Sequence, residues 1–399
     1  MSASPEVVIV GAGIIGAACA YELAGAGARV TVLERGGEWG EGCSWGNAGL
    51  IVPSHARPIA APESLGAGLG WMLRRSSPFG LRLRPSLAPW LARYLRASTP
   101  ARAAAGERLQ RELSAESLTM LRELSRSGID AGFAERGMLA VYTDDPDAAA
   151  EEAESETGQA RGAQVLTAEQ ARELEPALSD AVRAGVLFPH EADLDPVRLV
   201  RSLGAAAIEK GAELRGGAEA TGLHPGRVVT TAGVVSAGQV VLAAGAWSGR
   251  LAATAGVRLP MQGGKGYAVE WEPIALRRPL YMHDQRCVAN PLDDRVRVTG
   301  GLILDGLDER FDPRRAHAVR AAAAKVLNLR AEPRLVWHGL RPCTPDGLPV
   351  IGSRNGVILA TGHGMLGVTL APLTGRLVAD LIAGRADHPA LGPLSPERF

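Results

Sequence analysis

The sequence predicts an α/β protein built from two domains. The chain has 399 residues, which is more than one hydrophobic core usually holds. Near the N-terminus, an apolar run at Val7–Val10, a helix-like segment at Ala17–Leu23 and a second apolar run at Arg29–Leu33 follow one another. Strands that alternate with helices in this way are typical of a parallel sheet covered by helices.

A turn with three glycines joins the first strand to the first helix. The glycine spacing alone is weak, but a strand before it, a helix after it and an acid at the end of the next strand are typical of dinucleotide binding. Gly11 makes the tight turn, Gly13 lets a pyrophosphate approach, and Gly16 allows close helix packing. The alternative is an ordinary glycine-rich turn. The expected contacts at this end are Gly11, Gly13, Ile14, Gly16, Glu34 and Arg35.

Glu34 indicates which kind of dinucleotide is bound, and the composition excludes some classes of protein. An acid at this position suits a ribose diol rather than a 2′-phosphate. The 43 basic and 43 acidic residues balance, so no nucleic-acid footprint is indicated. No apolar run is long enough for a bilayer span, and no signal peptide is evident. Scattered cysteines without metal-type spacing fit a reducing compartment. We therefore expect a cytoplasmic protein, with peripheral contact to the inner face of the cell membrane left open.

The first half of the chain contains a long connection and several helices. Arg35–Pro62 is rich in Gly, Pro, Ser and Trp, and such long loops are usually functional. Leu69–Arg126 is helical in pattern, and Met138–Tyr142 is a strand candidate. Pro146–Arg172 is acidic and reads as helix. Gly185–Pro189 is a further strand candidate.

Short strands and three further helices are predicted from Asp195 onward. Asp195 and Pro196 suit the N-cap and first position of a helix that runs to about Lys210. The further elements are strands at Gly211–Leu223, Val228–Val235 and Gln239–Ala243, alternating strands over Pro260–Val298, a helix at Asp312–Leu327, strands at Pro333–Gly339 and Val357–Thr361, and a helix at Gly367–Ala383.

This order predicts a nucleotide-binding domain assembled from separated stretches, with a second domain inserted between them. The expected bounds of the nucleotide domain are 1–68, 186–255 and 335–399. The expected bounds of the substrate or cap domain are 69–185 and 256–334, and this domain should hold antiparallel strands with helices.

Two late strand ends indicate a ligand longer than a nicotinamide dinucleotide. Val240–Ser248 ends in small residues that let a cofactor pass, and Val357–Gly367 runs through a glycine-rich turn into a helix. Such a helix start suits a developing anion, as on a reduced flavin. The alternatives are a buried strand end and a structural cap. His363 in the second turn is more often structural than catalytic.

Arg341 is the candidate for substrate binding. It follows an apolar strand and precedes the proline-rigid stretch Pro342–Pro349. A guanidinium held there can bind a carboxylate through two hydrogen bonds. The alternative is an arginine that pairs with an acid of the fold.

These motifs together identify the chain as similar to FAD-dependent oxidoreductases of the D-amino-acid oxidase superfamily. The resemblance covers essentially the whole chain and is greatest to the small subunits of D-amino-acid dehydrogenases, with glycine and sarcosine oxidases more distant. It rests on the segments Gly11–Glu34, Cys43–Leu50, Trp71-Met72, Asp193–Pro196, Val240–Ser248, Gly339–Gly352 and Ala360–Asp380. The Gly-Asn-Ala-Gly loop is its most specific feature.

The resemblance implies a fold and a reaction. The fold is a glutathione-reductase-type Rossmann domain for FAD with a substrate domain that caps the flavin. The reaction is hydride transfer from the Cα of an amino acid to flavin N5, which gives an imine that water hydrolyses to a keto acid. The substrate would be a D-amino acid or a cyclic secondary amino acid such as D-proline or D-hydroxyproline. No general base is required, because the Cα hydrogen leaves as hydride.

The resemblance also implies roles for individual residues. Arg341 matches the arginine that holds the substrate carboxylate, and Tyr267 matches a substrate contact more loosely. His55 is either a substrate contact or a cap of its loop. Relatives that tether the flavin use a cysteine where this chain has Gly339, so we expect non-covalent FAD. The implied FAD contacts are Ser44, Asn47, Ala48, Gly49, Leu50, Ala220, Ala244, Gly245, Trp247, Gly362, His363, Gly364 and Met365.

Three alternatives remain at this point. One is a glycine- or sarcosine-type amine oxidase that uses O2, and another is a flavin-binding subunit of a larger dehydrogenase. The third is a nicotinamide-dependent dehydrogenase, which leaves both late strand ends without a role. The expected partners are a small amino-acid substrate and an electron acceptor such as a quinone, a dye or O2.

Overall fold

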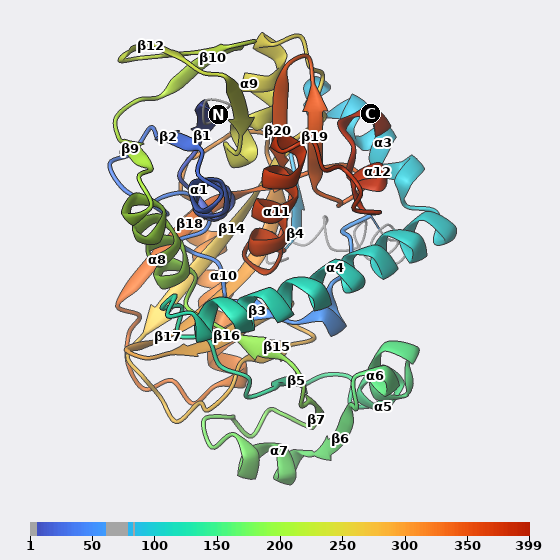
Figure 1. Cartoon of the computed structure of the whole chain (residues 1–399). Helices are drawn as coiled ribbons and strands as arrows, with labels where there is room; N and C mark the ends of the chain where they lie inside the picture. The colour runs from blue at the N-terminus through green and yellow to red at the C-terminus, as the bar shows by residue number, and fades with distance from the viewer. Residues whose placement is uncertain (1–5, 61–78, 83) are drawn as a thin grey trace.

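A computed structural model describes residues 6–60, 79–82 and 84–399 (Figure 1). It contains parallel and antiparallel sheets with helices packed on them, which confirms the predicted α/β class. Trp71 and Met72, on which the resemblance partly rests, lie outside the described residues. Within the described ranges, every helix is too short or too polar to cross a membrane.

The first sheet has six strands drawn from three distant parts of the chain. Five of its strands are parallel, and only β19, at one edge, runs the other way. Val8 of β1 pairs with Thr31 on one side and with Val240 on the other. The strand order is β19 (Val350–Arg354), β20 (Val357–Thr361), β13 (Gln239–Leu242), β1 (Glu6–Val10), β2 (Arg29–Leu33) and β9 (Glu213–Arg215).

Helices cover one face of this sheet. α1 (Ile14–Gly25) packs between α8 (Pro196–Glu209) and α11 (Gly367–Ile382), and α4 (Pro100–Arg126) lies against α11 (Figure 1). The Asp195 carboxylate accepts the N–H of Val197 at 2.9 Å, so the predicted cap of α8 is confirmed. The other face is covered by α9 (Ser248–Thr254) and the meander β10 (Ala220–His224), β11 (Arg227–Thr230) and β12 (Gly233–Ser236).

The second large sheet has nine strands and is mainly antiparallel. One face is covered by α10 (Pro313–Val326), whose N-cap is Asp312, the first residue of the predicted helix. The strand order is β18 (Leu335–Cys343), β14 (Gln262–Trp271), β17 (Arg295–Leu304), β16 (Cys287–Leu292), β15 (Leu280–Met282), β5 (Met138–Tyr142), β7 (Ala184–Phe188) and β6 (Gln164–Thr167), with β4 (Phe79–Leu81) beside β17.

The remaining elements are short. β3 (Leu50–Ile51) pairs with β8 (Ala192–Asp193) in a two-stranded sheet. Helices α5, α6 and α7 gather with β6 and β7 at the end of the molecule farthest from the meander (Figure 1). The short elements are α3 (Ala88–Ala97), α5 (Asp147–Glu154), α6 (Glu156–Ala160), α7 (Ala168–Leu174), α12 (Leu391–Leu394), η1 (Pro53–His55), η2 (Pro85–Leu87), η3 (Gly245–Trp247) and η4 (Pro396–Arg398).

Four predicted segments differ from the structure. The predicted helical segment Leu69–Arg126 also contains the strand β4, which pairs with β17. The predicted acidic helical segment Pro146–Arg172 also contains β6, because its Gln-Val-Leu-Thr run pairs with β7. The predicted strand Gly211–Leu223 is two strands in different sheets, since Gly216-Gly217 interrupts it and Gly217 has a φ of +68°. Val228–Val235 is the β11–β12 hairpin, turned by Gly233 at a φ of +127°.

The division into two domains stays a prediction. β18 falls within the stretch assigned to the nucleotide domain, yet it pairs with β14 in the nine-stranded sheet. This strand therefore connects the two parts of the molecule directly, and it carries Arg341.

Candidate functional site

The carboxyl ends of four neighbouring parallel strands meet at one edge of the six-stranded sheet. β20, β13, β1 and β2 are adjacent and parallel, so the turns that follow them lie side by side. Ligands of open parallel sheets bind at this edge. A cavity of about 470 Å³ lies there. The predicted contacts that line it are Gly11, Gly13, Ile14, Glu34, Arg35, Ser44, Ala220, Ala244, Gly245, Trp247, His363 and Gly364.

The three glycines of the first turn differ in what surrounds them. Gly11 has a φ of +107°, and an added Cβ would lie 2.6 Å from the Ala243 carbonyl oxygen. At Gly16 an added Cβ would lie 1.8 Å from the carbonyl oxygen of Gly11. At Gly13 the nearest atom is Ser44 Oγ at 3.5 Å, an ordinary contact. Gly11 and Gly16 are therefore required by the fold, whereas Gly13 leaves space that opens to the cavity.

The start of α1 presents amide groups next to this space. Ser44 Oγ accepts the N–H of Ile14 at 3.0 Å. The two carboxylate oxygens of Glu34 accept the N–H groups of Ala12 at 2.7 Å and of Gly36 at 3.1 Å. These three amides already have acceptors, so it is the positive end of the helix dipole, together with the space at Gly13, that suits a phosphate group. The chemistry of this edge therefore fits the dinucleotide expected from the sequence.

The loop that follows β2 lies between the two sheets. The Asn47 side chain accepts the N–H of Gly49 at 2.8 Å and donates to the Met365 carbonyl at 3.4 Å. Leu50 pairs with Asp193 in the β3–β8 ladder. Asn47–Leu50 lie next to the lining residues that this loop contributes within the described part, which are Glu34, Arg35, Gly36, Glu41, Gly42, Cys43 and Ser44. Gly362 and Met365 likewise flank the lining residues of the second turn.

Arg341 lies beside that second turn. The Gly364 N–H donates to the Pro342 carbonyl at 2.9 Å, which joins the end of β18 to the turn after β20. The guanidinium lies over Gly266 of β14, where an added Cβ would be 2.2 Å from Arg341 Nη1. The glycine is therefore needed to make room for the arginine.

The guanidinium of Arg341 has no carboxylate partner among the described residues. Its Nη1 donates to the Gly301 carbonyl oxygen at 2.6 Å. Burial lowers the pKa of Arg341, and the nearby thiols Cys343, Cys43 and Cys287 oppose that shift. Of the two sequence interpretations, the described contacts do not support an arginine paired with an acid of the fold. A half-buried cation without an anion among the described residues favours a carboxylate ligand.

Tyr267 is not brought to Arg341. Side chains alternate across a strand, and Arg341 lies opposite Gly264 on β14, so Tyr267 faces the other side of the sheet. There its ring contacts Phe311 and His338. It lines a separate cavity of about 250 Å³ behind α10. Burial raises the pKa of the Tyr267 hydroxyl. The geometry gives no support to a substrate contact through this side chain.

His55 is also remote from the lining residues. Its Nε2 lies 2.9 Å from a Glu152 carboxylate oxygen, and its Nδ1 lies 2.8 Å from Ser54 Oγ. Its ring packs edge-on against Phe188 and Tyr281 at 5.0 Å. These contacts favour the second sequence interpretation, in which His55 caps its own loop.

His363 lines the cavity, but its ring is held by α11. Nε2 lies 2.9 Å from Thr374 Oγ, and the Thr374 hydroxyl donates to the Leu370 carbonyl, so Nε2 carries the proton. Burial lowers the pKa of His363 to about 3, which keeps the ring neutral. This arrangement favours a structural role over a catalytic one.

Acid should destabilise the protein partly through His363. Because its folded pKa lies below the unfolded value of about 6.5, the unfolded chain binds a proton first as pH falls. The contribution is complete above pH 6.5 and is lost toward the folded pKa, by about 1.4 kcal/mol per pH unit. His363→Gln should therefore lose less stability than wild type between pH 7 and pH 5. Parallel urea titrations would check this, and equal pH slopes would contradict it.

Some lining residues were not predicted from the sequence. Arg250 and Thr254 of α9 and Glu219 before β10 line the cavity. Arg250 lies one helical turn after Trp247. A helix predicted directly after the small residues at the end of β13 would have placed Arg250 at the cavity. Glu219 adjoins Ala220, which was predicted, and no local pattern marked it.

Comparisons with known proteins agree with this geometry. The family model for DAO, FAD-dependent oxidoreductases, matches residues 6–381. The chain is 34% identical to a D-amino acid dehydrogenase of Paramagnetospirillum magneticum, with 99% of each chain covered. It is 34% identical to D-amino acid dehydrogenase 2 of Ralstonia nicotianae, over 98% of this chain and all of the other.

A solved structure shows the same architecture. The structure of glycine oxidase from Geobacillus kaustophilus superposes with a TM-score of 0.77 at 28% identity and covers 100% of both chains. Family match, relatives and architecture agree with the cavity at the strand ends. The chain belongs to the DAO family of FAD-dependent oxidoreductases.

Proposed function

We propose that this enzyme is an amino-acid dehydrogenase that oxidises the Cα–N bond of a small D-amino acid. The observation that carries the proposal is Arg341, a half-buried guanidinium without an acid partner among the described residues, next to the turn after β20. The relatives named D-amino acid dehydrogenase support the choice of substrate class and its stereochemistry. A cyclic secondary amino acid such as D-proline belongs to the same class.

The residues at the strand ends would hold FAD along the edge of the sheet. Gly13 and the start of α1 would bind the pyrophosphate, and Glu34 would bind the ribose. The turn after β20 and the start of α11 would meet the pyrimidine end of the flavin, where a helix N-terminus suits negative charge. When bound, FAD supplies a hydride acceptor. The start of α1, the space at Gly13 and the four adjacent strand ends fit such an elongated group.

Arg341 would bind the substrate carboxylate and thereby orient the Cα–H bond. Hydrogen bonds from one guanidinium to both carboxylate oxygens fix direction as well as distance. The amine must be neutral when hydride leaves Cα, and the resulting imine is hydrolysed by water to a keto acid and ammonia. No side chain has to remove a proton from Cα, because the hydrogen leaves as hydride. Neither His363 nor His55 is therefore needed as a general base.

FAD is proposed to bind without a covalent bond. Gly339 stands where tethered relatives carry a cysteine, and it has no side chain to offer. Burial raises the pKa of Cys343 to about 12, which makes this thiol a poor nucleophile. Acid precipitation of the holoenzyme should leave all yellow colour in the supernatant. Colour retained in the pellet would contradict non-covalent binding and would point to Cys43, which lines the cavity.

The proposed activity predicts a spectral change. The protein purified with FAD should be yellow, and its flavin absorbance should bleach anaerobically with a D-amino acid but not with its L-enantiomer. A panel of D-amino acids, glycine, sarcosine and D-proline would identify the substrate. If the yellow protein bleaches with none of them, the proposed function is wrong.

The electron acceptor distinguishes the proposed dehydrogenase from the main alternative, an oxidase. The likeness to glycine oxidase favours an O2-using amine oxidase as the second candidate. Turnover with a quinone or dye in the absence of oxygen, and slow reoxidation in air, would support a dehydrogenase. Rapid peroxide formation in air would support the oxidase. Activity that requires an added protein fraction would indicate a subunit of a larger dehydrogenase.

A further inference from the structure

We propose that Arg297 and Asn290 are positioning residues. They would hold the loop Cys43–Leu50 in the backbone conformation in which it faces the flavin. This inference rests on the proposed function. Both side chains come from the nine-stranded sheet, and both donate to main-chain carbonyls of this loop. Neither residue stood out in the sequence, and neither lines the cavity.

Arg297 reaches the loop from near the start of β17. It is fully buried, and its Nη1 donates to the Asn47 carbonyl oxygen at 2.9 Å. Its Nε and Nη2 contact one carboxylate oxygen of Glu270 at 2.8 and 2.7 Å. The guanidinium also lies 4.9 Å from the centre of the Trp45 ring. One side chain therefore joins the loop, through Asn47 and Trp45, to the strand β14.

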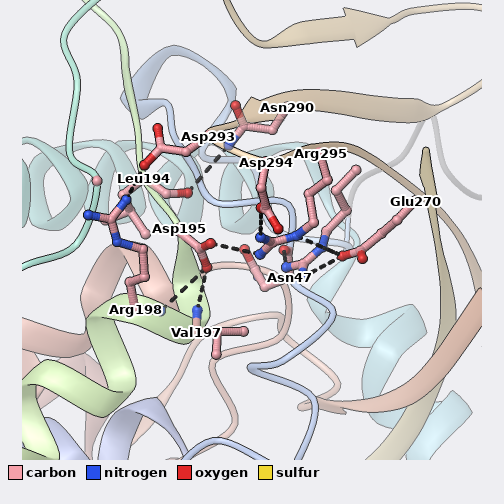
Figure 2. Close-up of polar contacts among 12 residues, drawn as sticks. Asn47, Leu194, Asp195, Val197, Arg198, Glu270, Asn290, Asp293, Asp294 and Arg295 are labelled. Atoms are coloured by element: carbon pink, nitrogen blue, oxygen red, sulfur yellow. Dashed lines mark hydrogen bonds and ion pairs between the residues drawn. The ribbon is translucent and has the colours of Figure 1, made fainter. Parts of the chain in front are cut away.

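Asn290 holds the next peptide group of the loop. It is fully buried on β16, and its Nδ2 donates to the Ala48 carbonyl at 2.8 Å and to the Leu194 carbonyl at 3.4 Å. Figure 2 shows the Asn290 side chain directed toward Leu194, at the segment that leads into α8. Two consecutive carbonyls of the loop are thus bound by two buried donors.

A network of ion pairs fixes the position of Arg297. Glu270 also accepts from Arg295 Nε at 3.1 Å, and Arg295 Nη2 pairs with Asp195 at 2.7 Å. Asp195 in turn caps α8 through the N–H of Val197. Figure 2 shows Arg295 between Asp195 and Glu270. The network therefore ties two strands of the nine-stranded sheet to a helix that packs on the six-stranded sheet.

The two donors determine how the loop presents its other groups. A trans peptide is planar, so its N–H points away from its carbonyl. With the Asn47 carbonyl directed to Arg297, the N–H of Ala48 faces the opposite way. The Asn47 side chain also donates to the Met365 carbonyl in the turn after β20. Arg297 and Asn290 together therefore orient the loop relative to the nine-stranded sheet, which carries Arg341, and relative to the turn after β20.

A purely structural role would not need this chemistry. Buried ion pairs commonly contribute little net stability, because desolvation offsets the attraction, and apolar side chains of similar volume often serve as well. Donors aimed at two carbonyls of a loop, by contrast, give it one orientation. Small misplacement of groups around reacting atoms costs rate even when the misplaced residue does not touch them.

The test compares three variants in the holoenzyme. Arg297→Lys keeps the charge beside Glu270 but loses the fork that reaches Asn47, and Asn290→Leu removes the donor to Ala48. Arg278→Lys is the matched control, because Arg278 pairs with the buried Glu175 in the same part of the molecule without touching the loop. Each variant is measured for Tm, FAD dissociation constant, flavin absorption spectrum, midpoint potential, kcat and KM.

The expected result separates the two loop variants from the control. Arg297→Lys and Asn290→Leu should shift the flavin absorption bands and potential, and lower kcat by about 10- to 100-fold with KM changed less than about twofold. Arg278→Lys should lower Tm alone. If both loop variants also lower only Tm, the proposal is wrong, and Arg297→Lys alone decides this if Asn290→Leu does not fold. A wild-type protein that binds no FAD would instead overturn the proposed function itself.

Discussion

Gly13→Val should abolish retention of FAD while leaving the chain folded. An added Cβ at Gly13 meets only Ser44 Oγ, at 3.5 Å, so the protein itself has room for a side chain there. Gly13 has a φ of −71°, which any residue adopts, and loss of a good N-cap residue typically costs about 1 kcal/mol. The valine would instead occupy the space through which the pyrophosphate approaches the start of α1.

The expected loss is large because the contacts involved are charge-assisted. Hydrogen bonds to a charged group contribute about 1.5–3 kcal/mol each, so losing two should weaken FAD binding by about 100-fold or more. FAD added to the apoprotein should raise Tm in wild type and not in the variant. Isothermal titration and the yellow colour after gel filtration measure the same loss. A variant that stays fully yellow would show that the cofactor lies elsewhere.

Two further glycine variants make the test specific. Gly392 is exposed in α12 with open space around it, so Gly392→Val should bind FAD like wild type. Gly16→Ala places a methyl group 1.8 Å from the Gly11 carbonyl oxygen, so it should lower Tm of the apoprotein itself. Only Gly13→Val should separate binding from folding, which distinguishes a glycine required by the ligand from one required by the fold.

The sequence predicted this part of the molecule well because its signals are local. A buried parallel strand is an apolar run, and the turn after it needs glycine, so β2 and β20 have the bounds predicted for them. The same reasoning placed β5 and the cap Asp195. Adjacent parallel strands then bring together turns that are more than three hundred residues apart in the chain. The order of strands and helices in the sequence was enough to predict that these turns lie close together.

The parts that could not be predicted depend on pairing between distant strands. Whether Tyr267 faces Arg341 depends on the β14–β18 register, and a shift of one residue would reverse the answer. Arg297 and Asn290 act on main-chain carbonyls of a loop some 240 to 250 positions earlier in the chain, and a carbonyl acceptor carries no sequence signature. His363 was ambiguous for the same reason, since its partner Thr374 is recognised only once α11 is placed.

Arg341→Met should raise KM for the amino acid strongly without destabilising the protein. Its guanidinium contacts one carbonyl oxygen and, among the described residues, no acid. Loss of a desolvated charge pair with a ligand costs about 2–5 kcal/mol, so kcat/KM should fall by about 30-fold or more. Flavin absorbance and FAD affinity should stay unchanged, because Arg341 does not line the cavity at the strand ends.

The stability of the same variant decides between the two interpretations of Arg341. An arginine paired with an acid of the fold would leave a buried unpaired charge when replaced, and Tm would fall by several degrees. An arginine that binds a carboxylate ligand is itself an unpaired charge in the substrate-free enzyme. Burial lowers the pKa of Arg341, so the charged guanidinium destabilises the folded state. Replacing it with methionine should then leave Tm of the substrate-free enzyme unchanged or higher.

A substrate without a carboxylate completes the argument. If Arg341 binds the carboxylate, the amide of the preferred amino acid should be a poor substrate of the wild type, and Arg341→Met should reduce its turnover little further. A variant that impairs acid and amide equally would act through the structure of β18 rather than through a carboxylate. Retained Tm, raised KM for the acid and an unchanged flavin spectrum together are the pattern that only a carboxylate-binding arginine predicts.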